Sequence, residues 1–82
     1  MVNVIFDKKF IKIFSKIKDN KLKNRIIKQI KKVSQNLDVG KPMRNTRKGT
    51  RELYIKPFKL SYAVSGNKKE VYMLDLYHKK FQ

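Results

Sequence analysis

The residues of this chain that could do chemistry lie in its second half. Arg51, Lys56 and Lys59 occur in a stretch where apolar and polar residues alternate, and the only histidine, His78, follows beside two lysines. Histidine exchanges protons near neutral pH, and ammonium and guanidinium groups bind phosphate through charge-assisted hydrogen bonds. Placed together on a sheet, these side chains would suit a polyanion whose phosphodiester bond is held or attacked. The alternative is that they are ordinary solvated residues of a very basic chain.

Other residues nearby have types that contact nucleic acids. Tyr54 is expected on the same strand face as Lys56, where its ring could stack on a base as aromatic residues do on RNA-binding sheets. Tyr77 could either stack in this way or belong to the core. Three residues of a basic loop at 38–50 are expected to contact an RNA backbone without sequence preference: Arg44, Arg47 and Lys48.

The net charge of the chain points to a negatively charged partner. Among its 82 residues, 22 are Lys or Arg and 6 are Asp or Glu, which gives a formal charge of +16. Repulsion among so many like charges destabilises a compact monomer, whereas solubility needs a net charge with a magnitude of only about 2–8. The excess predicts nucleic acid, an anionic membrane or an acidic protein as the partner. A membrane suits least, because the apolar stripes of the helices are needed for the core.

The residue types also limit the class of protein and its compartment. The length predicts a single domain, 1–82. One histidine and no cysteine cannot build a standard transition-metal site, so we expect no metal and no small-molecule cofactor. The absence of disulfides favours the cytoplasm. No apolar run is long enough to span a membrane, and the first residues meet a charge too soon for a signal peptide.

Hydrophobic periodicity predicts the helices. Apolar residues recur three and four positions apart over 8–18 and, most clearly, over 21–36, which predicts two amphipathic helices. Asp7 stands at the N-cap position of the first helix, and Asp19-Asn20 is a turn and capping signal between the two. The short connection predicts an antiparallel helical hairpin.

Alternation of apolar and polar residues predicts the strands. They are expected at 2–6, 51–56, 58–64 and about 70–78. Tyr62 is expected in the core, and the last strand, apolar on both sides, is expected inside the sheet. In that strand Val71 and Met73 would share one face, and the other face would carry Tyr72, Leu74 and Leu76. The result is an α+β domain of order β-α-α-β-β-β, with the helical hairpin packed on one face of a mostly antiparallel four-stranded sheet.

The order of these elements, together with three motifs, resembles the RelE/ParE superfamily of toxins from type II toxin–antitoxin systems. The motifs are Gly-Lys-Pro at 40–42, Arg-Glu-Leu-Tyr-Ile-Lys-Pro-Phe-Lys-Leu-Ser-Tyr-Ala at 51–63 and Leu-Tyr-His-Lys-Lys at 76–80. The resemblance spans nearly the whole chain and is most specific in its second half. It implies one of two activities, because RelE-like members cut messenger RNA, typically in the ribosomal A site, and ParE-like members poison DNA gyrase. It also implies an acidic, partly disordered antitoxin that wraps the toxin.

The resemblance assigns roles to particular residues. RelE-like enzymes use basic residues of the central strands to bind and polarise the phosphate, and Lys56 and Lys59 match those places, with Arg51 as a third. Near the end of the last strand, relatives place an acid, a base or a stacking group. In this chain those positions are Tyr77, His78 and Lys79. The chain departs from the family pattern by ending soon after them and by having lysines where relatives often have arginines, which loses the planar bidentate guanidinium.

The predicted function is that of a RelE-like mRNA interferase, a metal-independent and ribosome-dependent endoribonuclease that inhibits translation. Attack by a ribose 2′-OH needs a base, a group that stabilises charge on the phosphorane and help for the leaving 5′ oxygen, and His78 is the expected base. The expected partners are an acidic antitoxin, mRNA and ribosomal RNA. Two alternatives stay open: a ParE-like gyrase-inhibiting toxin, and a nucleic-acid-binding module without catalysis.

Overall fold

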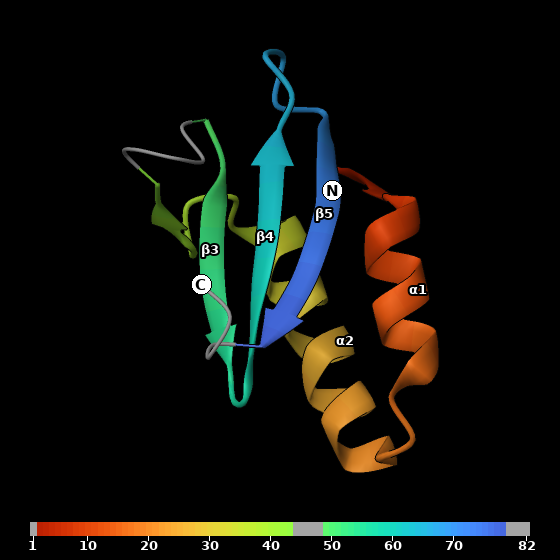
Figure 1. Ribbon diagram of the computed structural model, residues 1–82. Helices are drawn as coiled ribbons and strands as arrows, with labels where there is room; N and C mark the ends of the chain where they lie inside the picture. Colours follow the sequence, from red (N-terminus) through yellow and green to blue (C-terminus); the bar gives the residue numbers. More distant parts are fainter. Residues whose placement is uncertain (1, 44–48, 79–82) are drawn as a thin grey trace.

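The computed structural model describes residues 2–43 and 49–78, which contain two helices and five strands (Figure 1). In chain order they are β1 (Asn3–Phe6), α1 (Lys8–Lys16), α2 (Asn20–Gln35), β2 (Lys41–Pro42), β3 (Arg51–Ile55), β4 (Phe58–Val64) and β5 (Glu70–His78). The predicted order of elements is confirmed, with one short strand, β2, added between α2 and β3. Within the described ranges, neither helix is long and apolar enough to cross a membrane.

The strands form one mixed sheet in the order β1-β5-β4-β3-β2. β1 runs parallel to β5, and the remaining neighbours pair antiparallel. The α+β class is confirmed, as is the interior position of β5. The sheet has five strands where four were expected, because Lys41–Pro42 pairs with the start of β3 at the edge. Two residues are too few to show alternation, so the sequence of the loop at 38–50 does not reveal this strand.

α1 begins at the predicted residue, Lys8, and α2 begins at Asn20, one residue before its predicted start; both have the predicted kind of cap. The Asp7 carboxylate accepts a hydrogen bond from the backbone N–H of Lys9, and the Asp19 carboxylate caps α2 in the same way. Each carboxylate satisfies backbone donors that a first helical turn leaves unpaired. α1 ends at Lys16, two residues before its predicted end, where Ile17 takes an extended conformation and enters the core.

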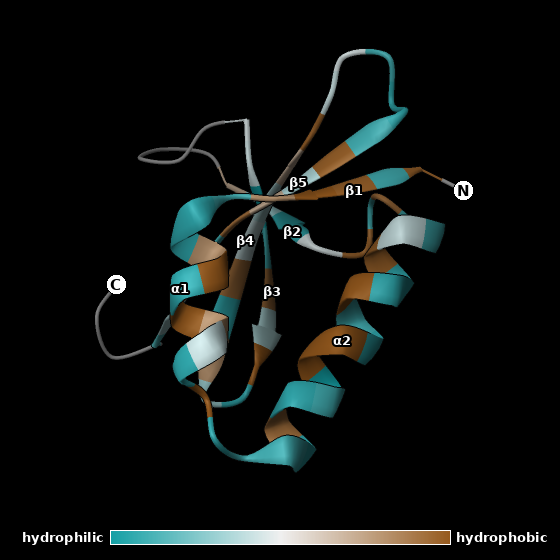
Figure 2. Ribbon diagram, turned by 90° about the vertical axis from the view of Figure 1, so that its right-hand side faces the viewer, coloured by the Kyte–Doolittle hydropathy of each residue, from teal (hydrophilic) through white to brown (hydrophobic). Residues whose placement is uncertain are grey.

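The core lies between the helical hairpin and one face of the sheet (Figure 2). The helices contribute their apolar stripes, and the sheet contributes alternate residues of β3, β4 and β5. The buried apolar side chains are Phe10, Ile17, Leu22, Ile26, Ile30, Val33, Ile55, Leu60, Tyr62, Val71, Met73 and Leu76. This side of the sheet is its core face. The opposite side, which no helix of the described residues covers, is its open face.

One irregularity in the pairing of β4 with β5 changes which side chains share a face. Ser61 pairs with Asp75, but the next residue, Tyr62, pairs with Met73. Leu74 is therefore an extra residue on β5, which is the arrangement of a β-bulge. Because side chains alternate strictly along a strand, one extra residue exchanges the two faces for every residue that follows it.

The bulge corrects the faces expected for the last strand. Leu76 is fully buried on the core face with Met73, whereas uninterrupted alternation would put it with Tyr72 on the opposite face. The expected grouping of Leu76 with Tyr72 is therefore wrong. The same exchange turns Tyr77 to the open face and His78 to the core face. Tyr77 pairs with Lys59, and His78 pairs with Phe58, which is on the core face with Leu60.

Tyr62 fastens the loop that follows α2 to the core. Its hydroxyl accepts a hydrogen bond from the Gly40 N–H at 2.8 Å and donates one to the Leu37 carbonyl at 2.9 Å. A Cβ atom at Gly40 would lie 2.6 Å from the Tyr62 hydroxyl oxygen, so the backbone can approach the ring only without a side chain. This contact fixes the position of β2, which begins at Lys41.

We expect Tyr62→Phe to lower the free energy of unfolding by about 1–3 kcal/mol, because a buried backbone N–H and a partly buried carbonyl lose their partner. Burial raises the pKa of Tyr62, so the unfolded chain ionises this phenol at a lower pH than the folded protein does. Its contribution to stability is therefore complete below about pH 10 and is lost as the pH rises further.

Urea unfolding of both proteins at about pH 8 and about pH 11 measures this contribution, since the phenol is neutral at the first pH and ionises in the unfolded chain at the second. The parent should lose more stability between the two pH values than Tyr62→Phe does. Equal losses would show that the Tyr62 hydroxyl does not carry the alkaline sensitivity.

Candidate nucleic-acid interface

Side chains from three strands meet on the open face of the sheet. The register sets Tyr54 of β3 opposite Lys59 of β4, and Lys59 opposite Tyr77 of β5. Glu52 lies two residues before Tyr54 on the same strand, so its side chain leaves on the same face. Directly opposed residues on antiparallel strands have Cβ atoms about 4.5–5.5 Å apart, so Glu52, Tyr54, Lys59 and Tyr77 form one group, the open-face cluster.

A cleft of about 730 Å³ opens beside this cluster. Its lining residues are Lys41, Pro42, Met43, Glu52, Tyr54 and Lys59. The short edge strand β2 forms one wall, and Glu52, Tyr54 and Lys59 of the open-face cluster form the other. The cleft falls within the range of about 300–1,000 Å³ that is usual for ligand sites. Tyr54 is 50% exposed, and an aromatic ring on a sheet is the kind of side chain that stacks on RNA bases.

Glu52 lies at the centre of the open-face cluster and is nearly inaccessible, with 6% of its side chain exposed. Its Oε1 atom is 3.6 Å from Lys59 Nζ, and its Oε2 atom accepts a hydrogen bond from the Tyr77 hydroxyl. A buried carboxylate needs a partner of opposite charge, and Lys59 supplies it. No role is predicted for Glu52 from the sequence. The alternation of the strand does indicate its position: Glu52 lies two residues before Tyr54 and therefore shares a sheet face with Tyr54 and Lys59.

His78 lies on the other side of the sheet from Lys59. It pairs with Phe58, and its imidazole packs against the Phe58 ring with centroids 5.7 Å apart and an angle of 71° between the planes. Because the neighbouring pair, Lys59 and Tyr77, occupies the open face, His78 occupies the core face. The structure does not bring the imidazole and the Lys59 ammonium to one point, in contrast to the sequence-based expectation.

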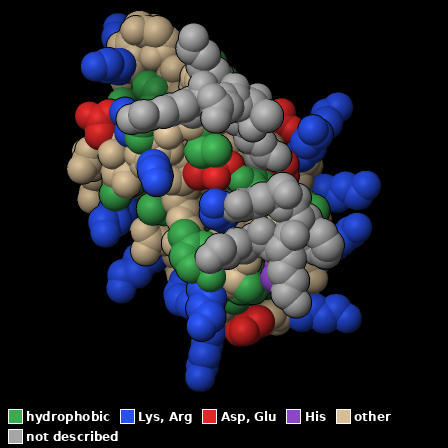
Figure 3. Space-filling model, turned by 60° about the vertical axis from the view of Figure 1, so that its left-hand side comes forward, with side chains coloured by type: hydrophobic (Ala, Val, Ile, Leu, Met, Phe, Trp, Pro, Cys, Tyr) green, Lys and Arg blue, Asp and Glu red, His purple; other side chains and the backbone are tan. Residues whose placement is uncertain are grey.

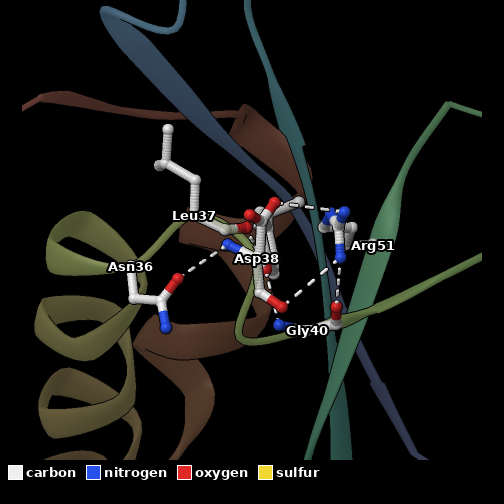
Figure 4. A network of polar contacts seen from close by, with 6 residues as sticks. Asn36, Leu37, Asp38, Gly40 and Arg51 are labelled. Carbon is white, nitrogen blue, oxygen red and sulfur yellow. Dashed lines mark hydrogen bonds and ion pairs between the residues drawn. The ribbon is translucent and has the colours of Figure 1, made fainter.

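Arg51 is also not part of the cleft lining, and its side chain reaches the loop between α2 and β2 (Figure 4). Its guanidinium donates a hydrogen bond to the Gly40 carbonyl at 2.7 Å and lies 3.2 Å from a carboxylate oxygen of Asp38. It pairs with Tyr62, a core residue, and so leaves β3 on the core face. In this position Arg51 holds the loop between α2 and β2, and it does not meet Lys59.

Lys56 occupies the turn between β3 and β4 and is exposed. Its backbone carbonyl accepts a hydrogen bond from the Arg25 guanidinium at 3.1 Å, which ties the turn to α2. Its side chain is not part of the cleft lining, and the cation beside Tyr54 is Lys59. Four further residues predicted to contact RNA lie outside the described residues: Arg44, Arg47, Lys48 and Lys79.

The surface around the cleft side is predominantly basic. Lysine and arginine side chains project around the outline of the molecule in Figure 3, and acidic side chains occupy only a few places in that view. With a formal charge of +16, the surface has a field that attracts polyanions from a distance. The cleft itself is different, because Glu52 already balances the charge of Lys59 there.

A second surface feature is an apolar groove of about 330 Å³ between the helices. It is lined by Phe6, Phe10, Ile11, Phe14, Ser15, Ile27 and Ile30. Ile11 is 52% exposed and Ile27 41%, so both present apolar surface to solvent. Neither helix contains an acidic residue, and Lys23 Nζ lies 5.5 Å from the Phe14 ring centroid. The groove is therefore apolar inside and cationic around it.

No protein-family model and no curated protein sequence matches the chain. Solved structures do match. A chain of the RelBE2 toxin–antitoxin complex from Mycobacterium tuberculosis superimposes with a TM-score of 0.81 at 21% identity, over 95% of this chain and 98% of that one. The YoeB/ParE toxin from Agrobacterium tumefaciens superimposes with a TM-score of 0.84 at 13% identity, over 94% of this chain and 98% of that one. A chain of the ParDE system from P. aeruginosa superimposes with a TM-score of 0.75 at 22% identity, over 95% of this chain and 96% of that one.

This protein has the fold of the RelE/ParE superfamily toxins over nearly its whole length. The resemblance that the sequence motifs indicate is thus confirmed for the fold. Proteins named for RelE, YoeB and ParE match with TM-scores from 0.75 to 0.84, so the backbone alone does not distinguish between these proteins.

Proposed function

We propose that this protein is the toxin of a toxin–antitoxin pair and that it cleaves mRNA on the ribosome. The fold is shared with solved RelE, YoeB and ParE toxins, which supports the toxin class. The observation that carries the choice of RNA cleavage is the open-face cleft, where the Lys59 cation and the exposed Tyr54 ring are directly opposed on neighbouring strands. A cation for the phosphate beside a ring for the base is the combination that binds single-stranded RNA.

Cleavage would proceed by attack of the ribose 2′ oxygen on the adjacent phosphorus. The 2′ proton passes to solvent water, the P–O5′ bond breaks as the P–O2′ bond forms, and the leaving 5′ oxygen takes a proton from water, which leaves a 2′,3′-cyclic phosphate and a 5′ hydroxyl. In this proposal Lys59 stabilises the charge on the phosphorane, and Tyr54 stacks on a neighbouring base. Lys41, on the opposite wall of the cleft, contacts the RNA backbone. This route needs no metal ion, because the charge on the phosphorane is met by side-chain cations.

We expect Lys59→Gln to lower cleavage by about 10²-fold, since the loss of one donor to a transition-state charge costs about 10²–10³ in rate. Glutamine keeps an N–H donor for the buried Glu52, so the fold should persist. Primer extension on message bound to programmed ribosomes measures the new 5′ ends. Lys69→Gln, which makes the same charge change at an exposed position outside the cleft, is the control. Equal losses in the two variants would mean that net charge, and not the cleft, is responsible.

His78→Ala tests whether the imidazole takes part in proton transfer. We expect a loss of less than about tenfold, because the ring packs on Phe58 at the core face, whereas removing a general base costs about 10²–10⁴. The same primer-extension assay, together with a thermal unfolding curve, separates chemistry from stability. A loss as large as that of Lys59→Gln in a fully folded variant would assign the base role to His78.

A ParE-like toxin that inhibits DNA gyrase is the second candidate. The separation of Arg51, Lys56 and His78 from Lys59 favours it, as does the match to the ParDE system. Purified protein added to a gyrase supercoiling assay and to programmed ribosomes distinguishes the two. Inhibited supercoiling with intact message would overturn the RNA proposal, and binding to nucleic acid without either effect would support a module without catalysis.

The partner we propose is an acidic antitoxin, and the apolar groove between the helices is the surface that suits it. An amphipathic helix with an acidic outer face would cover Ile11 and Ile27 and meet the cations around them. A gene for a small acidic protein directly beside the gene of this chain is the first observation that would support this partner.

We expect Ile11→Glu to weaken binding of that acidic protein by at least about tenfold, because it places an unpaired charge in an apolar contact. Toxicity should persist, since the groove lies on the other side of the sheet from the cleft. The control is Asn24→Glu, which also adds one negative charge, at an exposed position on α2 outside the groove lining. Isothermal titration of the two variants with the acidic protein measures the difference. Unchanged affinity for Ile11→Glu would remove the groove from the interface.

A further inference from the structure

A buried carboxylate is out of place in a cleft that should attract phosphate. The chain has only 6 acidic residues against 22 basic ones, yet one of them, Glu52, lies in the cleft lining with 6% of its side chain exposed. A buried ion is expensive to desolvate unless its partners compensate. The partners of its two carboxylate oxygens must therefore compensate for the burial of Glu52.

The two oxygens of Glu52 hold two different functional groups. Oε1 lies 3.6 Å from the ammonium of Lys59, and Oε2 accepts the hydrogen bond of the Tyr77 hydroxyl. Lys59 and Tyr77 come from adjacent strands and are directly opposed in the register. One carboxylate on β3 thus fixes the ends of two long side chains on β4 and β5, and Tyr54, also on β3, stands across from the same lysine.

The geometry argues against Glu52 as the base of the reaction. A general base must reach the proton that it takes, but both oxygens of Glu52 already have partners, and little of the side chain is accessible. A carboxylate in this setting orients the groups bound to it, as residues behind a reactive group do in enzyme sites.

We propose that Glu52 is a positioning residue that holds the Lys59 ammonium at the cleft and is bound on its other oxygen by the Tyr77 hydroxyl. This inference rests on the proposed function, for which Lys59 meets the reacting phosphate. Glu52 has two opposing effects on RNA. Its charge offsets that of Lys59 and weakens the attraction of the cleft for phosphate, and its hydrogen bonds restrict where the ammonium can be. Binding and turnover should therefore respond in opposite directions when the carboxylate is neutralised.

The test is Glu52→Gln, with Glu70→Gln as the matched control. Both remove one negative charge, and Glu70 lies at the start of β5, outside the cleft lining. In the ribosome assay we expect Glu52→Gln to lower kcat by about 10- to 100-fold, since a shift of about 1 Å in a reacting group can cost that much. KM should stay the same or fall. Glu70→Gln should leave kcat unchanged.

Binding of a short single-stranded RNA gives the second readout. The log–log salt dependence should steepen by about 0.7 in Glu52→Gln, the amount for one further phosphate contact on a single strand, and should not steepen in Glu70→Gln. An increase in both kcat and affinity would overturn the proposal, because it would make Glu52 only a brake on phosphate binding. An unchanged kcat would overturn it as well.

A second variant and a spectroscopic measurement test the proposal if Glu52→Gln does not fold or the parent protein is inactive. If Glu52→Gln fails to fold, Tyr77→Phe removes one hydrogen bond while leaving the carboxylate and the ammonium in place, and it should lower kcat with little change in RNA affinity. If the parent protein cleaves no RNA, the proposed function is overturned, and the ¹⁵N signal of the Lys59 ammonium decides the inference by itself. That signal should be protected from water exchange in the parent and lose its protection in Glu52→Gln. The same signal in both would refute the positioning role.

Discussion

The register between β4 and β5 is the constraint on which the rest of this structure depends. Up to Met73 the residues of β5 alternate in one phase, and after the bulge at Leu74 they alternate in the other. Leu76 can therefore complete the core beside Leu60. Without the extra residue, the faces of Tyr77 and His78 would be exchanged. A single irregularity in the backbone thus decides which of two neighbouring polar side chains reaches the open face.

The open face combines a strong general attraction with a restrained local site. The formal charge of +16 draws polyanions toward the whole surface, but the charge of Lys59 is balanced by Glu52. A freely moving lysine would bind any phosphate nearby. If the cleft binds RNA as proposed, a lysine fixed by a buried carboxylate, between the aromatic side chains of Tyr54 and Tyr77, would favour one arrangement of the bound strand. In this interpretation the surface concentrates RNA and the cleft selects its geometry.

The core side supports this site through the loop after α2. Tyr62 and Arg51, which are opposite each other on β4 and β3, both bind Gly40. Gly40 precedes β2, and β2 forms the wall of the cleft that faces the open-face cluster. Arg51, a candidate for phosphate binding by sequence, is thus positioned to shape the cleft from behind the sheet. The helical hairpin leaves its own groove on the far side, so RNA and a protein partner have separate surfaces in this proposal.

The sequence by itself determined the elements and the fold class, because helix caps such as Asp7 and the periodicity of apolar residues are local signals. It also indicated the RelE/ParE fold and the placement of Tyr62 in the core. Local signals could not locate the two-residue strand at Lys41–Pro42, which exists only through its pairing partner. They could not show the bulge at Leu74, since the number of residues between two pairings depends on how two strands meet. Tertiary structure alone therefore decided that Lys59 meets Glu52 and not His78.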